Sequence, residues 1–114
     1  GGGMQVPMTE IELIILDQLA DGGLPLGALV RELREGKRAW DAGLIVTGLS
    51  RLVERALLHY CRTPGGPIYT SPAPELIHAQ VVGLINRTPQ DWYLELTDDG
   101  QVAWEQWQQS RHSS

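Results

Sequence analysis

The stretch GLSRLVERALLHY, residues 48–60, predicts a helix that ends directly before a β-strand. Upstream of it, Asp41 is a suitable N-cap, because its carboxylate can accept hydrogen bonds from the free N–H groups of a first helical turn. Apolar residues then recur at helical spacing and predict one buried stripe, formed by Ile45, Leu49, Leu52, Val53 and Ala56. The next segment, residues 58–62, has the composition of a short strand. The fold prediction starts from this helix-to-strand junction.

Two further helices are predicted before residue 41. Thr9 and Glu12 form a Thr-x-x-Glu capping box ahead of an apolar run, so the first helix should begin just after Thr9 and stop at residues 21–23. Its apolar residues cover more than one stripe, which predicts burial on several sides, by the fold alone or by the fold and a second subunit. Pro25 suits the first turn of the second helix, which ends at Gly36. That helix has a single apolar stripe, formed by Leu26, Leu29, Val30 and Leu33.

After the predicted strand, residues 63–67 (TPGGP) carry the strongest turn signal in the chain. Residues 92–97 alternate in polarity as a half-buried strand does. A last helix should follow, with Thr97 as its cap. Asp98 and Asp99 then lie at the positive end of the helix dipole, where carboxylates are favourable.

The segment between residues 67 and 91 has two interpretations. Its apolar residues Ile77, Val81, Leu84 and Ile85 stand at helical spacing. The same segment is rich in β-branched residues and precedes TPQD, residues 88–91, which can close a hairpin onto the strand at residue 92. The helical spacing favours a short extra helix here.

Length and composition limit the class of protein. The 114 residues suffice for one hydrophobic core, so we expect one domain over residues 4–109, with a polar tail at 110–114. Gly1–Gly3 is interpreted as a non-native extension before the original start. No apolar run approaches the roughly 18 residues of a membrane span, and a single cysteine with no signal peptide predicts a cytoplasmic protein. The net charge of −5 excludes a broad basic field for nucleic acid, so any DNA contact must be local.

Two motifs resemble those of winged helix-turn-helix proteins. LSRLVERALLHY, residues 49–60, is similar to the end of the family's third helix and its first wing strand. YLELTDDGQVAWEQW, residues 93–107, resembles the second wing strand and the Leu-Thr-x-x-Gly turn into the C-terminal helix of MarR-like and PadR-like bacterial regulators. The resemblance implies an α+β fold with a three-helix core, a small antiparallel wing sheet and a C-terminal helix. Nearly thirty residues separate the strands here, so residues 67–91 would be an enlarged wing or an insertion.

The resemblance also implies a DNA-binding transcriptional regulator whose third helix enters the major groove. It would place Thr47, Ser50 and Arg51 near the bases, and only Arg51 has the fork geometry for guanine. The phosphate contacts would come from Lys37, Arg38 and Arg62. The alternatives are that Lys37 and Arg38 are solvated turn charges and that Arg51 pairs on the surface with Glu54 or Glu35. The competing function is a winged helix that docks another protein through its acidic surface and does not bind nucleic acid.

The family often dimerises through its terminal helices, so the resemblance favours a homodimer. Its interface would use Ile11, Ile15, Trp104 and Trp107, although both tryptophans can equally pack on the body of the domain. Cys61 is interpreted as a small buried residue, and His59, His78 and His112 have no metal-ligand spacing. Because no catalytic set and no phosphate loop is found, we expect neither an enzyme nor a metal or cofactor site.

Overall fold

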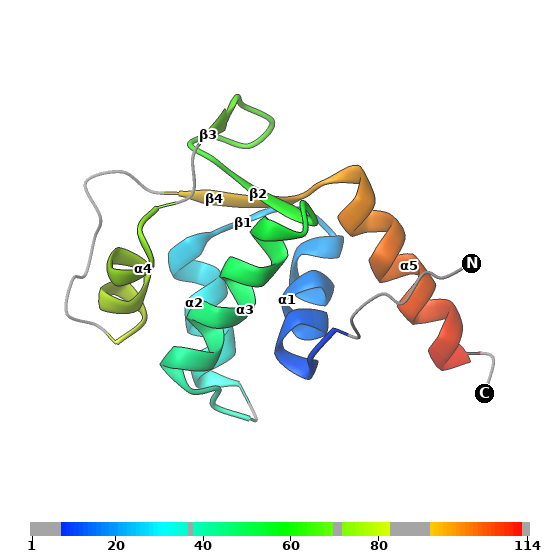
Figure 1. Ribbon diagram of the computed structural model, residues 1–114, viewed down its shortest axis with the longest axis horizontal. Helices are drawn as coiled ribbons and strands as arrows, with labels where there is room; N and C mark the ends of the chain where they lie inside the picture. The colour runs from blue at the N-terminus through cyan, green and yellow to red at the C-terminus, as the bar shows by residue number, and fades with distance from the viewer. Residues whose placement is uncertain (1–7, 37, 70–71, 83–91, 113–114) are drawn as a thin grey trace.

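In the part of the chain that the structure describes, the five helices and the two central strands lie where the spacing of apolar residues in the sequence predicts them. The structure, a computed structural model, describes residues 8–36, 38–69, 72–82 and 92–112. Gly1–Gly3 and Lys37 lie outside these residues. In chain order the elements are α1 (Glu10–Ala20), β1 (Leu24–Pro25), α2 (Leu26–Glu35), α3 (Ala42–Glu54), β2 (Leu58–Cys61), β3 (Ile68–Tyr69), α4 (Pro74–Val81), β4 (Tyr93–Leu96) and α5 (Asp98–His112) (Figure 1). The described residues therefore form an α+β fold with five helices and a small antiparallel sheet.

Side-chain caps fix the starts of two helices. Asp41 Oδ2 accepts a hydrogen bond from Gly43 N at 2.9 Å, which confirms the predicted N-cap of α3. Thr97 Oγ1 accepts from Gly100 N at 3.0 Å at the start of α5, as predicted. The capping contacts predicted for Thr9 were wrong. Thr9 makes no side-chain bond to the backbone of α1, and its hydroxyl donates instead to Glu12 Oε1 at 2.8 Å.

The sheet contains two strands that the sequence did not predict. Its strand order is β1-β4-β2-β3, and all pairs are antiparallel. In β1, Leu24 pairs with Leu94, so Pro25 belongs to an edge strand and caps α2 rather than lying in its first turn. Both β1 and β3 are two residues long, which is too short for a polarity pattern to reveal them.

The segment between the central strands β2 and β4 leaves the sheet and returns to it. Cys61 at the end of β2 pairs directly with Tyr93 at the start of β4, although 31 residues separate them in the chain. The predicted extra helix is confirmed as α4, which packs against α3 and places Ile77 and Val81 in the core. The alternative hairpin turn at residues 88–91 falls outside the described residues.

The core lies between the sheet and the helices α1, α2, α3 and α4. The sheet crosses one end of the helical layer, α4 flanks α3, and α5 stands beside α1 on the opposite side (Figure 1). α1 and α3 approach closely at Gly48, where an added Cβ would lie 3.2 Å from the tip of Ile15. Ala56 was predicted in the buried stripe, but it is exposed and has a φ of 57°, because the chain reverses there between α3 and β2.

The two isoleucines assigned to a dimer interface belong to this intramolecular core. Ile11 is 5% exposed and Ile15 is 0% exposed, so neither side chain is available to a second subunit. The structure therefore contradicts that assignment. The all-round apolar character of α1 arises because α3, α5 and β4 all pack against it.

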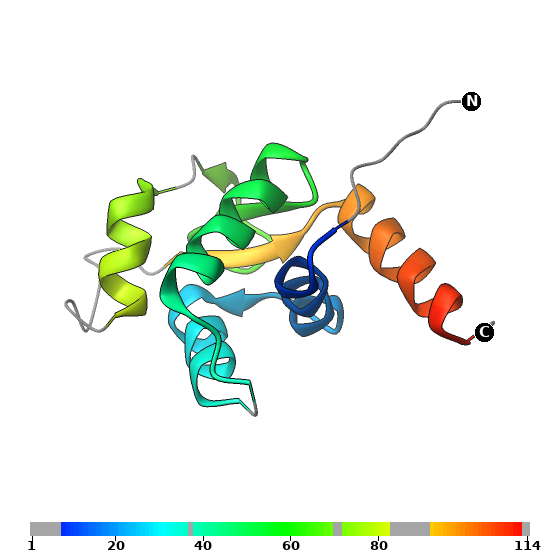
Figure 2. The ribbon, with the colours of Figure 1, turned by 60° about the horizontal axis from the view of Figure 1, so that its bottom comes forward.

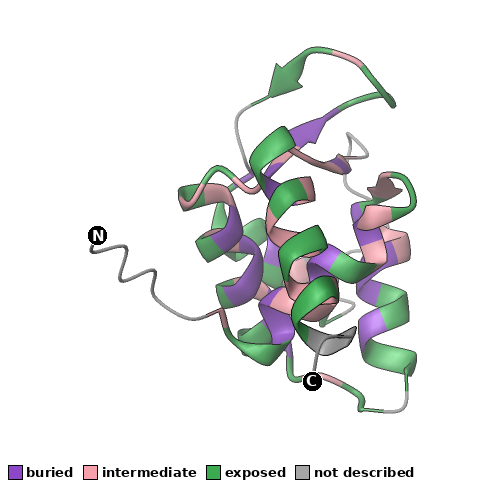
Figure 3. Ribbon diagram, turned by 90° about the vertical axis from the view of Figure 1, so that its right-hand side faces the viewer, coloured by how far each residue is buried: buried purple, intermediate pink, exposed green. Residues whose placement is uncertain are grey.

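α5 extends away from the rest of the molecule, as the turned view shows (Figure 2). Within α5, Gly100 is the one buried residue among those whose burial is described, and the outward side of the helix is open to solvent (Figure 3). Trp104 packs partly against the core, and its indole N–H donates to Asp17 Oδ1 of α1 at 3.0 Å. Trp107 is half-buried. Intramolecular packing thus accounts for the position of Trp104.

Candidate functional site

One side of α3 remains uncovered by its neighbours. α1 and α4 pack against other sides of this helix. We call the exposed residues the α3 strip, and its members are Gly43, Leu44, Thr47, Arg51 and Glu54. Of the predicted base-proximal residues, Thr47 and Arg51 lie on this strip, whereas Ser50 is half-buried at its margin. The strip is mixed in character, with one cation, one carboxylate and a leucine that is 48% exposed.

Arg51 lies beside the carboxylate of Glu12, a partner from another helix. Its Nη1 lies 3.8 Å from Glu12 Oε1, and Arg55 Nη1 lies 3.3 Å from Glu12 Oε2. Glu12 is only 1% exposed, so its charge depends on these arginines and on the Thr9 hydroxyl. Among the described residues, the ion pair of Arg51 is thus with Glu12 and not with the expected partners Glu54 and Glu35. The Glu12 network ties the first turn of α1 to the last turns of α3.

The described phosphate candidates also have intramolecular contacts. Arg38 forms an ion pair with Glu10 at the start of α1, and its guanidinium stacks 4.5 Å from the centre of the Trp40 ring. Arg62 stacks 4.5 Å from the ring centre of Tyr69, across the turn that joins β2 to β3. Both arginine side chains remain exposed. Arg38, Arg51 and Arg62 thus contact different partners: Glu10 and Trp40 for Arg38, Glu12 for Arg51, and Tyr69 for Arg62.

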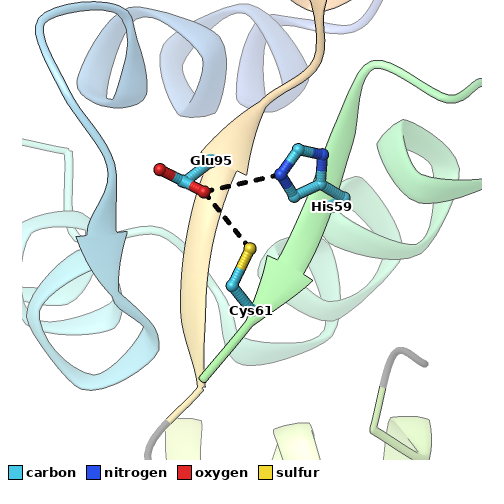
Figure 4. Close-up of side chains that lie close together, drawn as sticks. All are labelled: His59, Cys61 and Glu95. Carbon is cyan, nitrogen blue, oxygen red and sulfur yellow. Dashed lines mark hydrogen bonds and ion pairs between the residues drawn. The ribbon is translucent and has the colours of Figure 1, made fainter. Parts of the chain in front are cut away.

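A second group of functional side chains gathers on β2 and β4. His59 and Cys61 alternate with the core residues Leu58 and Tyr60, and therefore share the other face of β2. Glu95 is the cross-strand partner of His59. The three side chains converge, with Cys61 Sγ 3.2 Å and His59 Nε2 3.5 Å from Glu95 Oε1 (Figure 4). We call these residues the β2–β4 cluster.

The turn after β2 folds back onto this cluster. Gly65, at a φ of 71°, donates its backbone N–H to Glu95 Oε2 at 3.2 Å. This bond holds the carboxylate so that its other oxygen faces His59 and Cys61. Residues 63–66 form the turn itself, where Gly66 N donates to the Thr63 carbonyl oxygen. Glu95 thus connects the two central strands with the tip of the hairpin.

The electrostatics of the cluster keep the thiol protonated. Burial, the hydrogen bond to Glu95 and the negative charge of Glu95 together raise the pKa of Cys61 to about 11. Burial alone would raise the pKa of Glu95, but hydrogen bonds from Cys61, Gly65 and His59 outweigh it, and the pKa is lowered. A protonated thiol is a poor nucleophile, so this arrangement does not activate Cys61 for covalent catalysis. Its thiol, imidazole and carboxylate are nevertheless three kinds of metal ligand.

The spacing of the histidines alone does not reveal this cluster. His59 has neither another histidine nor an acidic residue at ligand spacing, and Glu95 lies 36 residues further along the chain. The available signal was the His-x-Cys pair on a predicted strand, since residues i and i+2 share one face. The third member depends on the register that pairs His59 with Glu95, which no local pattern encodes.

Among the described residues, no helix has the length and apolar character needed to cross a membrane. Comparison with protein-family models, curated proteins and solved structures gave no match.

Proposed function

We propose that the chain is a winged helix-turn-helix domain that binds double-stranded DNA through the α3 strip and acts as a small transcriptional regulator. The observation that carries this proposal is the exposed side of α3, which starts with a capped turn and is followed by a strand and a hairpin. In such an arrangement α3 is the helix that enters the major groove, and β2 and β4 are the two wing strands. Residues 67–91, within which β3 and α4 lie, would be the enlarged wing or insertion.

The contacts of Arg51 permit a role at the bases. Its side chain is 54% exposed and its pair with Glu12 is long, at 3.8 Å, so the guanidinium can exchange this partner for a guanine edge. Glu12 keeps Arg55 as a closer partner when Arg51 leaves. Thr47, one turn before Arg51 on the strip, supports a contact to a thymine methyl group or a phosphate.

The phosphate contacts of this proposal are few. Arg38 lies in the turn before α3 and Arg62 lies in the hairpin, and each is exposed enough to reach a phosphate. Lys37 stays a candidate beside Arg38 on the basis of its sequence position. With a net charge of −5 and few phosphate contacts, binding should be weak at moderate salt, and its dependence on ionic strength should be shallow, at about one unit of log–log slope per phosphate contact.

Fluorescence anisotropy with a mixed-sequence duplex, at low and moderate salt, tests the proposal. Arg38→Gln should weaken binding and reduce the salt slope by about one unit, whereas Arg51→Gln should weaken binding by about 1–3 kcal/mol on the preferred sequence. Glu10→Gln should strengthen binding, because it removes the carboxylate that pairs with Arg38. Arg111→Gln, near the end of α5, changes the net charge equally and serves as the control. Absence of binding at low salt would contradict the proposal.

A second candidate function is docking of another protein. It is favoured by the exposure of apolar side chains on the α3 strip and on the edge strand β3, namely Leu44 (48%), Ile68 (69%) and Tyr69 (39%). It is also favoured by the intramolecular contacts of Arg38, Arg51 and Arg62. If the wild type fails to bind DNA at low salt and Leu44→Glu leaves its thermal midpoint unchanged, this face is free for a protein partner.

The proposal includes a homodimer in which α5 contributes the contact surface. Its support is the outward side of α5, where Val102 is 49% exposed, and the half-buried Trp107 further along the helix. Sedimentation velocity at micromolar concentration tests it, with Val102→Glu as the disrupting variant. A monomer throughout that range would leave both tryptophans with intramolecular roles alone.

A further inference from the structure

The β2–β4 cluster has a geometry that the proposed DNA contacts do not use. Its three potential ligand atoms, one each from His59, Cys61 and Glu95, lie within 4.8 Å of one another. We propose that this cluster is a binding site for a divalent transition-metal ion, with zinc as the preferred ion. The site would join β2 to β4 at the base of the β2–β3 hairpin.

The spacing of the ligand atoms matches tetrahedral zinc closely. Zinc bonds of about 2.0–2.3 Å to nitrogen, oxygen and sulfur place neighbouring ligand atoms roughly 3.3–3.6 Å apart at tetrahedral angles. The Cys61–Glu95 separation of 3.2 Å and the His59–Glu95 separation of 3.5 Å already agree with this spacing. Only the separation between His59 and Cys61, which is at most 4.8 Å, has to shorten, by up to roughly 1.2–1.5 Å, and rotation of the side chains would allow this.

The ligand types favour zinc among the common ions. Thiolate and imidazole are the usual zinc ligands, and a carboxylate oxygen completes many sites, whereas magnesium and calcium require oxygen ligands alone. In the absence of metal, the protonated thiol of Cys61 donates a hydrogen bond to the carboxylate of Glu95. A bound cation would replace the thiol proton, so that the thiolate and the carboxylate would both bind the metal. Three protein ligands leave a fourth position for water or another ligand.

The surroundings of the cluster support its loading with metal. The side chains of His59 and Glu95 are 22% and 26% exposed, which leaves a route from solvent to the buried Cys61. The second oxygen of Glu95 is already oriented by Gly65 N–H, and such outer contacts strengthen metal sites. His59 Nδ1 is buried and has no hydrogen-bond partner among the described residues, so no contact there opposes a turn of the ring toward the ion.

Cobalt(II) titration of the untagged, reduced, chelator-treated chain tests the site directly. We expect one cobalt per chain, with the thiolate-to-cobalt charge-transfer band that reports a Co–S bond, and displacement of the band by zinc. We also expect zinc to raise the thermal midpoint above its value in chelator. A fully reduced wild type that develops no charge-transfer band overturns the proposal, whatever its affinity for DNA.

Ligand variants then separate this site from surface binding. Cys61→Ala, His59→Gln and Glu95→Gln should each weaken cobalt affinity by at least about a hundredfold. His78→Gln, on the exposed side of α4, is the matched control and should bind as the wild type does. Circular dichroism of the metal-free variants checks that each is folded, and His59→Gln serves as the partly exposed alternative if Cys61→Ala unfolds. Unchanged affinity in folded His59→Gln and Glu95→Gln overturns the assignment.

Discussion

Replacing Glu12 by glutamine removes the one buried charge that the described core contains, at nearly constant shape. Glutamine retains an oxygen for the Thr9 hydroxyl, but it loses the charge that faces Arg55 at 3.3 Å and Arg51 at 3.8 Å. Hydrogen bonds to charged groups contribute about 1.5–3 kcal/mol. Because both guanidinium groups reach solvent, we expect the lower half of this range, a loss of about 2 kcal/mol in the free energy of unfolding.

Denaturant titration of the wild type and the variant measures this loss, provided that the slope of the transition stays the same. The thermal midpoint should fall by roughly 8 °C, since a domain of this size shifts by about 4 °C per kcal/mol. Glu10→Gln is the matched control, because this residue carries the same charge in the same turn of α1 but is 58% exposed. Its effect should stay below about 0.5 kcal/mol.

A double-mutant cycle assigns the effect to the contact between Glu12 and Arg55. Glu12→Gln combined with Arg55→Gln should cost clearly less than the sum of the two single variants. If Glu12→Gln is as stable as Glu10→Gln, the buried carboxylate contributes no net stability and the reasoning about this network is refuted. If the two single losses of stability add up to the loss in the double variant, the Glu12–Arg55 contact is not the cause, and the loss arises from another contact of Glu12.

Three other perturbations follow from contacts of the fold. Gly100→Ala should destabilise the protein by at least about 2 kcal/mol in denaturant titration, because its Cβ would lie 1.9 Å from the Leu57 carbonyl oxygen, and a stable variant would contradict this packing. Asp41→Ala should cost about 1 kcal/mol by the loss of the α3 cap, measured in the same way, and Asp41→Asn should recover most of it. The raised pKa of Cys61 predicts stability that is complete below about pH 9 and is lost as the pH rises toward about 11, in metal-free protein. Cys61→Ala should remove the loss that begins near pH 9, whereas a loss above about pH 10 should remain, because burial also raises the pKa of Tyr60. A loss that still begins near pH 9 in the variant would contradict the assignment to Cys61.

The sequence predicted the elements whose signals are local. The Asp41 cap, the Thr97 cap and the apolar spacing around Ile77 each lie within a few residues of the helix that they specify, so α3, α5 and α4 were all predicted. β1 and β3 were missed because two residues carry no period. Their existence depends on strands that lie far away in the chain.

The candidate sites depend on tertiary contacts, and here prediction from sequence was incomplete. The predicted partners of Arg51 were Glu54 in α3 and Glu35 at the end of α2. Its partner is instead Glu12, which lies close because α1 packs on α3. The approach of Glu95 to His59 requires the register of β4 on β2. Ile11 and Ile15 were predicted at a subunit interface but lie in the core of the chain itself. Apolar residues on several sides of a helix predict burial, but they do not show whether a second subunit or the chain's own elements cover the helix.

Residues 62–92, which join β2 to β4, affect both the folding of the chain and its redesign. The ends of this segment are fixed side by side at Cys61 and Tyr93, so the chain closes a loop of 31 residues where a tight hairpin would suffice. Relative to a loop of four residues, the closure entropy costs about 2 kcal/mol more. Burial of Ile77 and Val81 of α4 contributes about 1.5–3 kcal/mol each, which offsets that cost. A short hairpin could therefore replace this segment only if the apolar surface that α4 covers on α3 were redesigned with it.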